Sequence, residues 1–121
     1  MERMSLEQYK KEVGVVNVTP SKYHNQNTYV DGIRFDSKTE GRRYQELKLM
    51  EQAGEISGFG RQPSFVVGLG VRYIPDFIVC GKDGNIWVED VKSDGTATAT
   101  FKVKQKLWRE RYPWIELRII K

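Results

Sequence analysis

The sequence predicts one globular α/β domain with a mixed β-sheet flanked by helices, and three observations lead to this. Two apolar runs on either side of a Lys-Asp-Gly turn predict a β-hairpin in the middle of the chain. Segments with helical periodicity precede and follow that hairpin, over residues 37–54 and 101–112. An alternating apolar stretch then closes the chain at residues 114–120, and a strand–helix–strand order implies a right-handed crossover to a parallel neighbour.

The first part of the chain is predicted to be an appendage over residues 1–26, with the domain itself occupying residues 27–121. Residues 5–13 are predicted to form a short helix with little apolar periodicity, and the polar residues 17–27 to form a linker. His24 is the only histidine and lies in this polar stretch. A loop histidine is therefore the better interpretation, because histidine-dependent nuclease sites need a second histidine or a dense local motif.

A hairpin and a long helix come next. Residues 28–35 predict a hairpin across an Asp-Gly pair, which suits a two-residue turn. The following helix is expected to begin at Ser37, because Glu40 stands three residues later at capping-box spacing, and to end at Gly54. Its expected inward-facing stripe is Tyr44, Leu47, Met50 and Glu51.

The second half of the chain alternates between strands and a helix. Residues 56–59 and 64–69 are strand candidates interrupted by glycine and proline. After the central hairpin, residues 93–100 are rich in small residues and predict a loop. A helix over residues 101–112 ends at a proline, and residues 114–120 form the last predicted strand.

The central hairpin determines which side chains share a face. Its apolar runs, residues 73–80 and 86–92, flank the Lys-Asp-Gly turn. A type I turn closed by Gly84 in the left-handed conformation makes a three-residue loop, which pairs Ile78 with Val88. A two-residue Asp-Gly turn would shift the register by one position and reverse the faces of one strand.

Two carboxylates and a lysine lie at the end of this hairpin. Counted outward, the three-residue loop pairs Asp76 with Asp90, and Lys92 shares their face because residues i and i+2 do. A two-residue turn would instead pair Asp90 with Phe77. Carboxylates suit Mg²⁺ or Mn²⁺, and a lysine can position a water and stabilise developing negative charge. The hypothesis is metal-assisted phosphodiester hydrolysis; the alternative is a surface strand with a weak Asp–Lys pair.

Other candidates have two interpretations each. Glu40 is either a further metal ligand or only part of the Ser37 capping box, and the spacing leaves both open. Glu89 is expected on the face opposite Asp90 and is interpreted as non-catalytic. Cys80 is the only cysteine, which excludes an internal disulfide and a cysteine-based zinc site, and its apolar strand favours a core position over a nucleophile.

The charge balance favours a polyanionic partner. Lys and Arg number 20 against 16 acidic residues, a net charge of +4. The basic residues gather within residues 38–48 and 102–111, where solvated helix faces are the alternative explanation. The predicted phosphate-contacting residues are Lys38, Arg42, Arg43, Lys102, Lys104 and Lys106. No long apolar run and no signal-like start are present, so a soluble cytoplasmic protein without a membrane partner is expected.

These residues resemble a known group of enzymes. Pro75-Asp76 followed by Asp90-Val91-Lys92, after a helical Glu40, resembles the PD-(D/E)XK nuclease superfamily, which has the restriction-endonuclease-like fold. The chain is also similar to small phage and prophage nucleases long catalogued as a domain of unknown function. That likeness covers about residues 22–115 and is carried by residues 30–33, 35–40, Arg43-Tyr44, Gln62-Pro63, 89–92, Phe101-Lys102, Lys104 and Lys106-Leu107.

The resemblance implies roles for these positions. It implies that Mg²⁺ (or Mn²⁺) is held by Asp76, Asp90 and the carbonyl of Val91, and that Lys92 orients the nucleophile. It favours a ligand role for Glu40. It also implies that Gln62 contributes a minor contact in the nucleic-acid site.

The function expected from the resemblance is Mg²⁺-dependent endonuclease action on DNA. The favoured substrate is branched DNA, as in a Holliday junction resolvase working as a homodimer, in the host-cell cytoplasm if the chain is phage-encoded. Two alternatives remain. One is a nuclease of phage replication or packaging that is indifferent to branches, and the other is a nucleic-acid-binding module on the same fold without catalysis.

Overall fold

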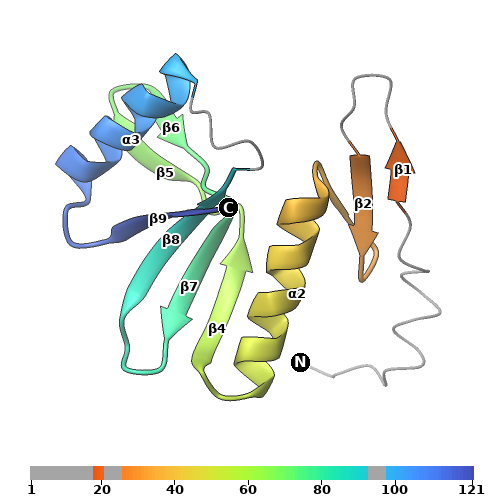
Figure 1. The fold of residues 1–121 in the computed structure, drawn as a ribbon. Coiled ribbons are helices and arrows are strands. Elements are labelled where there is room, and N and C mark those ends of the chain that lie inside the picture. The colour runs from red at the N-terminus through yellow and green to blue at the C-terminus, as the bar shows by residue number, and fades with distance from the viewer. Residues whose placement is uncertain (1–17, 21–25, 93–97) are drawn as a thin grey trace. The chain divides into compact units, whose positions relative to one another are not determined.

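The computed structural model describes residues 18–20, 26–92 and 98–121, and side chains from residue 27 onward within these ranges (Figure 1). The chain divides into two compact units, residues 1–45 and 46–121, which are described separately. The helix predicted at residues 5–13 and the loop histidine His24 lie outside the described residues. No helix among the residues described is long and apolar enough to cross a membrane.

The first unit contains a three-stranded antiparallel sheet in the order β1 (Val18–Pro20), β2 (Gln26–Val30), β3 (Ile33–Phe35). The predicted hairpin is confirmed: Val30 pairs with Ile33, and the turn residues between them have positive φ values of 55° and 75°. Two positive φ values are what a type I′ turn requires, and an Asp-Gly pair accepts them.

Strand β1 lies in the stretch predicted as a linker, so that prediction is wrong for Val18–Pro20 and for the start of β2. Val18 pairs with Thr28 and Pro20 with Gln26. A polar composition had suggested a loop, but pairing to β2 satisfies the backbone groups of these residues. The proline occupies a sheet edge, where a missing N–H is tolerated.

Helix α2 (Lys38–Gln52) has the two ends that the sequence predicts, and it crosses from the first unit into the second. At its start, the backbone N–H of Glu40 donates to Ser37 Oγ at 3.2 Å. At its end, Gly54 has φ 76° and the N–H of Glu55 donates to the carbonyl of Met50 at 2.9 Å. This is a Schellman motif, in which glycine accepts the left-handed conformation.

The inner face of α2 is narrower than predicted. Leu47 is fully buried, whereas Glu51 is exposed, so the prediction of an inward-facing Glu51 is wrong. Within the first unit the Tyr44 ring packs against Phe35, with centroids 5.2 Å apart. A Cβ on Gly41 would lie 3.1 Å from a methyl group of Thr28, so glycine is what lets α2 approach β2 this closely.

The second unit is built on a four-stranded mixed sheet in the order β4 (Ile56–Arg61), β7 (Phe77–Gly81), β8 (Ile86–Val91), β9 (Glu116–Ile120). β4, β7 and β8 are antiparallel neighbours, and β9 runs parallel to β8. Helix α3 (Ala99–Arg111) connects β8 to β9. The predicted fold class, an α/β arrangement with a mixed sheet flanked by helices, is confirmed, as is the parallel last pair.

The strand predicted over residues 64–69 is confirmed, but the hairpin that it forms with a second strand was not predicted. β5 (Phe65–Gly68) and β6 (Val71–Tyr73) pair with each other across a turn in which Gly70 has φ 69°. The run over residues 73–80, expected as one strand, is therefore broken between Tyr73 and Phe77. The proline in this break cannot donate to a strand ladder, which explains why the two strands separate here.

Helix α3 begins earlier than the predicted start at residue 101. Thr98 is its N-cap, and the side chain of Thr98 accepts a hydrogen bond from the N–H of Phe101 at 3.1 Å. The prediction of a loop through residue 100 is thus wrong at its end, because Thr98 is an N-capping residue and not only a small loop residue.

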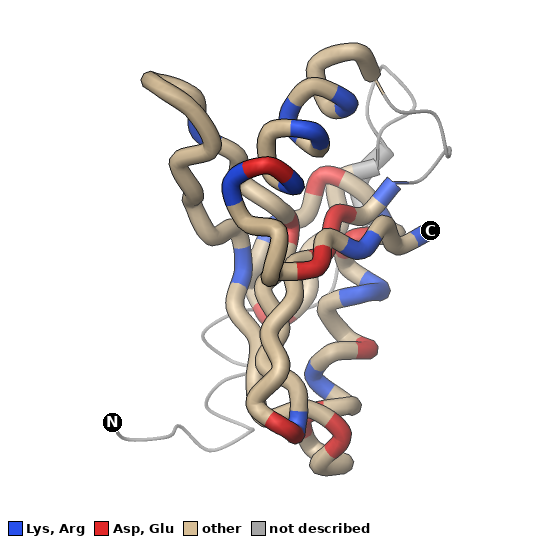
Figure 2. The backbone as a smooth tube through the Cα atoms, turned by 90° about the vertical axis from the view of Figure 1, so that its left-hand side faces the viewer, with Lys and Arg blue, Asp and Glu red and all other residues tan. Residues whose placement is uncertain are grey.

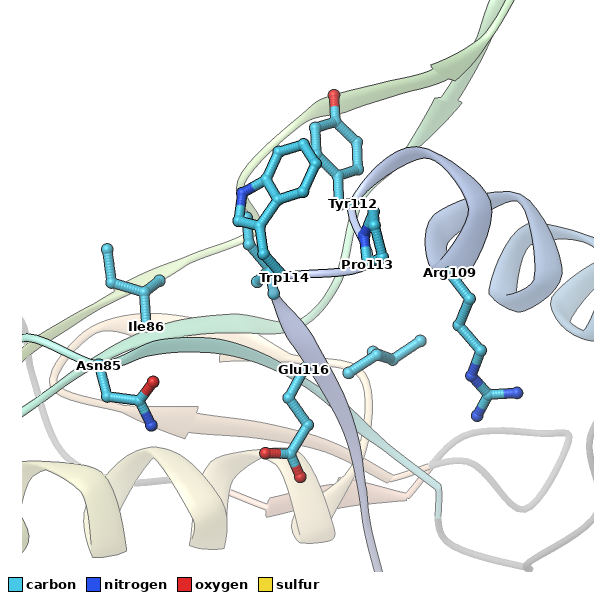
Figure 3. A pocket seen from close by; sticks show the side chains of 9 residues that line it. Asn85, Ile86, Arg109, Tyr112, Pro113, Trp114 and Glu116 are labelled. Atoms are coloured by element: carbon cyan, nitrogen blue, oxygen red, sulfur yellow. The ribbon is translucent and has the colours of Figure 1, made fainter.

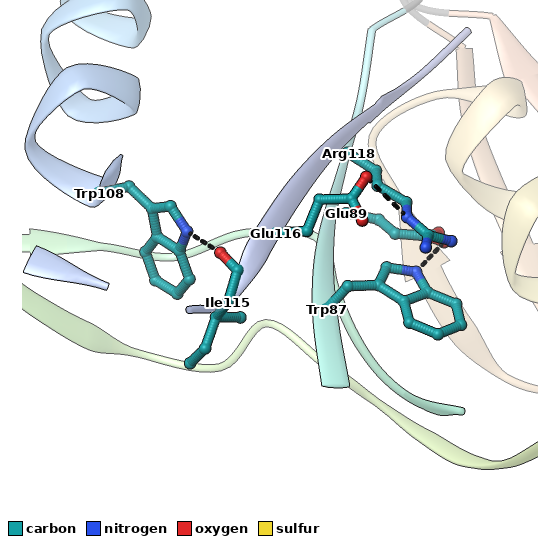
Figure 4. A network of polar contacts seen from close by, with 6 residues as sticks. All are labelled: Trp87, Glu89, Trp108, Ile115, Glu116 and Arg118. Atoms are coloured by element: carbon teal, nitrogen blue, oxygen red, sulfur yellow. Dashed lines mark hydrogen bonds and ion pairs between the residues drawn. The ribbon is translucent and has the colours of Figure 1, made fainter. Parts of the chain in front are cut away.

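The core of the second unit lies between one face of the sheet and α3 with the β5–β6 hairpin. Its buried members are Val67, Tyr73, Val88, Phe101 and Trp108. The indole of Trp108 is fully buried and donates to the carbonyl of Ile115 at 2.9 Å, which attaches α3 to the segment leading into β9 (Figure 4).

Candidate functional site

The turn of the β7–β8 hairpin has the geometry on which the predicted site depends. Gly81 donates to the carbonyl of Asn85 at 2.6 Å, and Gly84, with φ 82°, donates back to Gly81 at 3.1 Å. Ile78 pairs with Val88, as the three-residue loop requires. The predicted register is confirmed, and the two-residue alternative is excluded.

Asp76 lies at the point where β4, β7 and β8 meet. Counting one residue beyond the Phe77–Glu89 pair places it opposite Asp90. The backbone N–H of Val91 donates to Asp76 Oδ2 at 2.7 Å, and the N–H of Gln62 donates to the Asp76 carbonyl at 3.0 Å. Both the side chain and the backbone of Asp76 are therefore held by neighbouring strands.

Asp90 is held by a tyrosine that the sequence analysis did not identify. The hydroxyl of Tyr73 donates to Asp90 Oδ2, and both side chains are buried. Burial, then this hydrogen bond, then the charges of Asp90 and Asp76 raise the pKa of Tyr73 well above its ordinary value. The phenol therefore remains a proton donor, and both carboxylates lie close enough to act on it.

Lys92 follows on the same face of the sheet. Its backbone N–H donates to the carbonyl of Ile120 in β9 at 2.8 Å. Its ammonium group lies 4.0 Å from the centroid of the Phe101 ring, in the first turn of α3. Phe101 also packs near the Tyr73 ring, at 6.5 Å, so Lys92 and Asp90 both face the side of the sheet that α3 covers. A cation is attracted to the face of an aromatic ring, so this contact restricts the positions that the Lys92 ammonium group can take.

Glu89 faces the other way, as predicted. Its carboxylate is fully buried and accepts a hydrogen bond from the indole of Trp87 at 2.9 Å (Figure 4). Arg118 lies 3.9 Å from the centroid of the Trp87 ring and also pairs with Glu116 at 3.2 Å. Residues on opposite faces of β8 thus belong to separate polar networks.

The candidates on α2 belong to the first unit. Glu40 is half-buried there, and its backbone N–H takes part in the Ser37 cap. Asp76 and Asp90 lie in the second unit, so the ligand role of Glu40 stays a prediction. The same holds for the basic residues of this helix segment, of which two are exposed and one half-buried: Lys38, Arg42 and Arg43.

The basic residues of α3 divide by exposure. Lys102 and Lys106 are exposed and lie one turn apart, whereas Lys104 is half-buried on another side of the helix. Arg109 continues the row of Lys102 and Lys106 at the next turn and is also exposed. Figure 2 shows Lys and Arg recurring along this helix. Gln62 is exposed after β4, with φ 48°.

The chain matches the model of a family described as "Protein of unknown function (DUF1064)" over residues 20–121. It belongs to this family. The matched region contains Glu40, Asp76, Asp90 and Lys92. No curated protein and no solved structure matches the chain.

The carboxylates of this DUF1064 protein form a small donor set. Within the described residues, no group of three or more His, Cys, Asp or Glu side chains is arranged to hold a metal ion. The set that the second unit offers is therefore Asp76, Asp90 and backbone oxygen such as the carbonyl of Val91. It fits Mg²⁺, which is usually held by one or two carboxylates and keeps several waters.

Proposed function

We propose that this DUF1064 protein is a Mg²⁺- or Mn²⁺-dependent DNA endonuclease of the PD-(D/E)XK type. The observation that supports this most is the pair of restrained carboxylates, Asp76 and Asp90, with the ammonium of Lys92 on the Asp90 side of the sheet. Keeping charged groups of both signs beside an apolar core costs desolvation free energy, and such groups are concentrated at functional sites.

Each group has a role in this proposal. Asp76 and Asp90 hold the ion, together with the carbonyl of Val91. The ion, when bound, supplies charge stabilisation at the phosphate and lowers the pKa of a water. Lys92 orients the attacking water and stabilises the developing negative charge, and the Phe101 ring restricts where its ammonium can lie.

Tyr73 is a positioning residue in this scheme. Its hydroxyl donates a hydrogen bond to Oδ2 of Asp90, and this bond restricts rotation of that carboxylate. Hydrogen-bonded partners of this kind orient metal-binding carboxylates and tune their affinity. The N–H of Val91 does the same for Asp76. Glu40 is proposed as a further ligand, in keeping with the family resemblance.

The proposed substrate is branched DNA, specifically a four-way junction cut by a homodimer. Two symmetric nicks require two active sites related by a two-fold axis. Phosphates are expected to contact the exposed lysines of α3 and the basic residues of α2, with Gln62 as a minor contact. The positive charge of the chain, +4 overall, favours such a polyanion.

The test is cleavage of an end-labelled four-way junction and a matched linear duplex, with Mg²⁺ or Mn²⁺. Asp90→Asn is compared with Asp83→Asn, which changes an exposed aspartate in the turn of the same hairpin. Paired nicks in the junction alone, lost in Asp90→Asn and kept in Asp83→Asn, are the expected result.

Two other outcomes have clear meanings. Equal cleavage of both substrates would keep the nuclease and reject the junction preference. Salt-dependent binding with no cleavage in either metal would contradict the enzyme and favour a nucleic-acid-binding module.

A further inference from the structure

The second unit has a pocket at the end of α3 opposite the carboxylates. It has a volume of about 630 Å³ and lies between the hairpin turn, the end of α3 and the start of β9 (Figure 3). The lining residues that matter here are Asn85, Ile86, Arg109, Tyr112, Trp114 and Glu116. None of them has a role in the proposed catalytic site.

Trp114 is the most unusual of these residues, because 71% of its surface is exposed. Its ring packs edge-on against Tyr112, with centroids 5.9 Å apart. Tyr112 is itself fixed, since its hydroxyl donates to the carbonyl of Val66 at 2.7 Å and its ring lies against Trp108 at 4.7 Å. An exposed indole on a rigid support presents a ready stacking surface for a ligand.

Polar side chains line the same pocket as this indole. Figure 3 shows Asn85 from the hairpin, Glu116 from β9 and Arg109 from α3 around the pocket. The carboxylate of Glu116 is paired with Arg118 at 3.2 Å, so its charge is offset. The amide of Asn85 can hydrogen-bond the edge of a base, and the guanidinium of Arg109 can bind a phosphate. The indole of Trp114 can stack on the ring of a base.

Helix α3 and strand β8 both join this pocket to the carboxylates. Lys92 rests on Phe101 in the first turn of α3, and Arg109 lines the pocket from the last, about 12 Å further along the helix axis. On β8, Ile86 lines the pocket and Asp90 shares its face, about 13 Å away.

The exposed cations of α3 lie along this path. Lys102, Lys106 and Arg109 are spaced by four and then three positions, so they form one row from the carboxylate end to the pocket. A row of cations beside an aromatic platform is the arrangement that binds single-stranded nucleic acid, with phosphates on the cations and bases on the rings.

We propose that the pocket binds an unpaired nucleotide of a DNA strand, with its base stacked on Trp114 and its backbone running along Lys102, Lys106 and Arg109. A paired base must first be unpaired and unstacked before it can enter, which costs free energy, so the pocket favours strands that are already unpaired. That this strand leads to a cutting site rests on the proposed function; the binding itself does not.

The test is titration of a short oligothymidylate against the full chain in EDTA, where no metal-dependent cleavage takes place. Binding is followed by quenching of tryptophan fluorescence and, independently, by anisotropy of a labelled oligonucleotide. Trp87 and Trp108 are buried, so Trp114 is the indole that a ligand can reach. A blunt, fully paired two-stranded duplex with the same number of nucleotides is the comparison ligand.

Trp114→Ala is expected to weaken oligothymidylate binding about tenfold, and Trp114→Phe much less, because phenylalanine retains a stacking face. Duplex binding is expected to change little. Leu69→Ala, at another exposed apolar side chain, is the control and should match wild type. Arg109→Ala should reduce the slope of log affinity against log salt by about one.

Unchanged oligothymidylate affinity in Trp114→Ala would overturn the proposal, as would equal losses for oligothymidylate and duplex. A change confined to the sedimentation of the protein would also overturn it and mark the pocket as a contact between copies. The nuclease proposal stands or falls separately, because Asp90-dependent cleavage of DNA can persist in Trp114→Ala, and binding in EDTA can persist without cleavage.

Discussion

The two faces of β8 carry neighbouring buried carboxylates with different surroundings. Glu89 is 0% exposed and Asp90 is 5% exposed, so burial does not distinguish them. Glu89 accepts from an indole two residues before it on the same strand, a contact that needs nothing but β8 itself. Asp90 lies on the other face with a tyrosine from β6, beside Asp76 and on the face of Lys92.

The difference shows that the hydrogen-bond partners and neighbouring charges of a buried carboxylate, rather than its burial, indicate a candidate site. A carboxylate that accepts a hydrogen bond from a neighbouring indole has a structural explanation. The charges of two carboxylates, Asp90 and Asp76, both act on one tyrosine, and neighbouring negative charges of this kind favour an added cation. The face with Asp90 is therefore the one on which we propose that a metal ion binds.

The largest expected effect separates these two carboxylates by activity. Asp90→Asn should lower metal-dependent DNA cleavage by a factor of the order of 10³ or more, because it removes a charged ligand. Glu89→Gln should retain most activity, because an amide oxygen can still accept from Trp87. Initial rates on labelled DNA measure both, and comparable losses in the two variants would contradict the comparison.

Tyr73→Phe should sharpen the comparison of Asp90 with Glu89, because it removes the hydroxyl that donates to Asp90 but keeps the aromatic ring. We expect Mn²⁺ affinity, measured by calorimetry on the full chain, to change by about 10- to 100-fold, with a parallel change in the metal concentration that supports cleavage. Tyr112→Phe, which removes a tyrosine hydroxyl bonded elsewhere, is the control. Unaltered metal affinity in Tyr73→Phe would show that the hydroxyl is only structural.

Glu89→Ala should act on stability. It leaves the buried indole N–H of Trp87 without this acceptor, which lowers the free energy of unfolding by about 1–3 kcal/mol. Urea unfolding measures the change, with Glu55→Ala, at an exposed position, as the control. Equal midpoints for Glu89→Ala and wild type would mean that the Trp87–Glu89 bond contributes nothing.

The smallest expected effect is a pH dependence of unfolding. The pKa of Tyr73 is raised in the folded chain above its ordinary value of 10.0. The protonated phenol therefore contributes fully to the free energy of unfolding below pH 10, and this contribution decreases as the pH rises above 10. Wild type should lose up to about 1.4 kcal/mol per pH unit more than Tyr73→Phe in that range. Urea unfolding at pH 9 to 11 measures this, and parallel curves for both proteins would contradict it.

Local sequence signals determined much of the fold. The ends of α2 followed from Ser37 and Gly54, and the register of the central hairpin from Gly84, because each feature depends on the backbone of a few adjacent residues. That register in turn predicted which side of β8 Asp90 and Glu89 face. The fold class and the parallel last strand followed from the order of the elements.

The tertiary structure alone decided the features that join distant segments. β1, β6 and the pairing of β5 with β6 were missed, because a short strand gains its stability from a partner that composition does not reveal. Tyr73 reaches Asp90 only because the chain breaks at Pro75 and turns β6 toward the end of β8. The Trp114 pocket likewise exists only where α3, β9 and the hairpin turn converge. Side chains that meet from separate elements leave no periodic signal along the chain, which is why this part of the site required the folded structure.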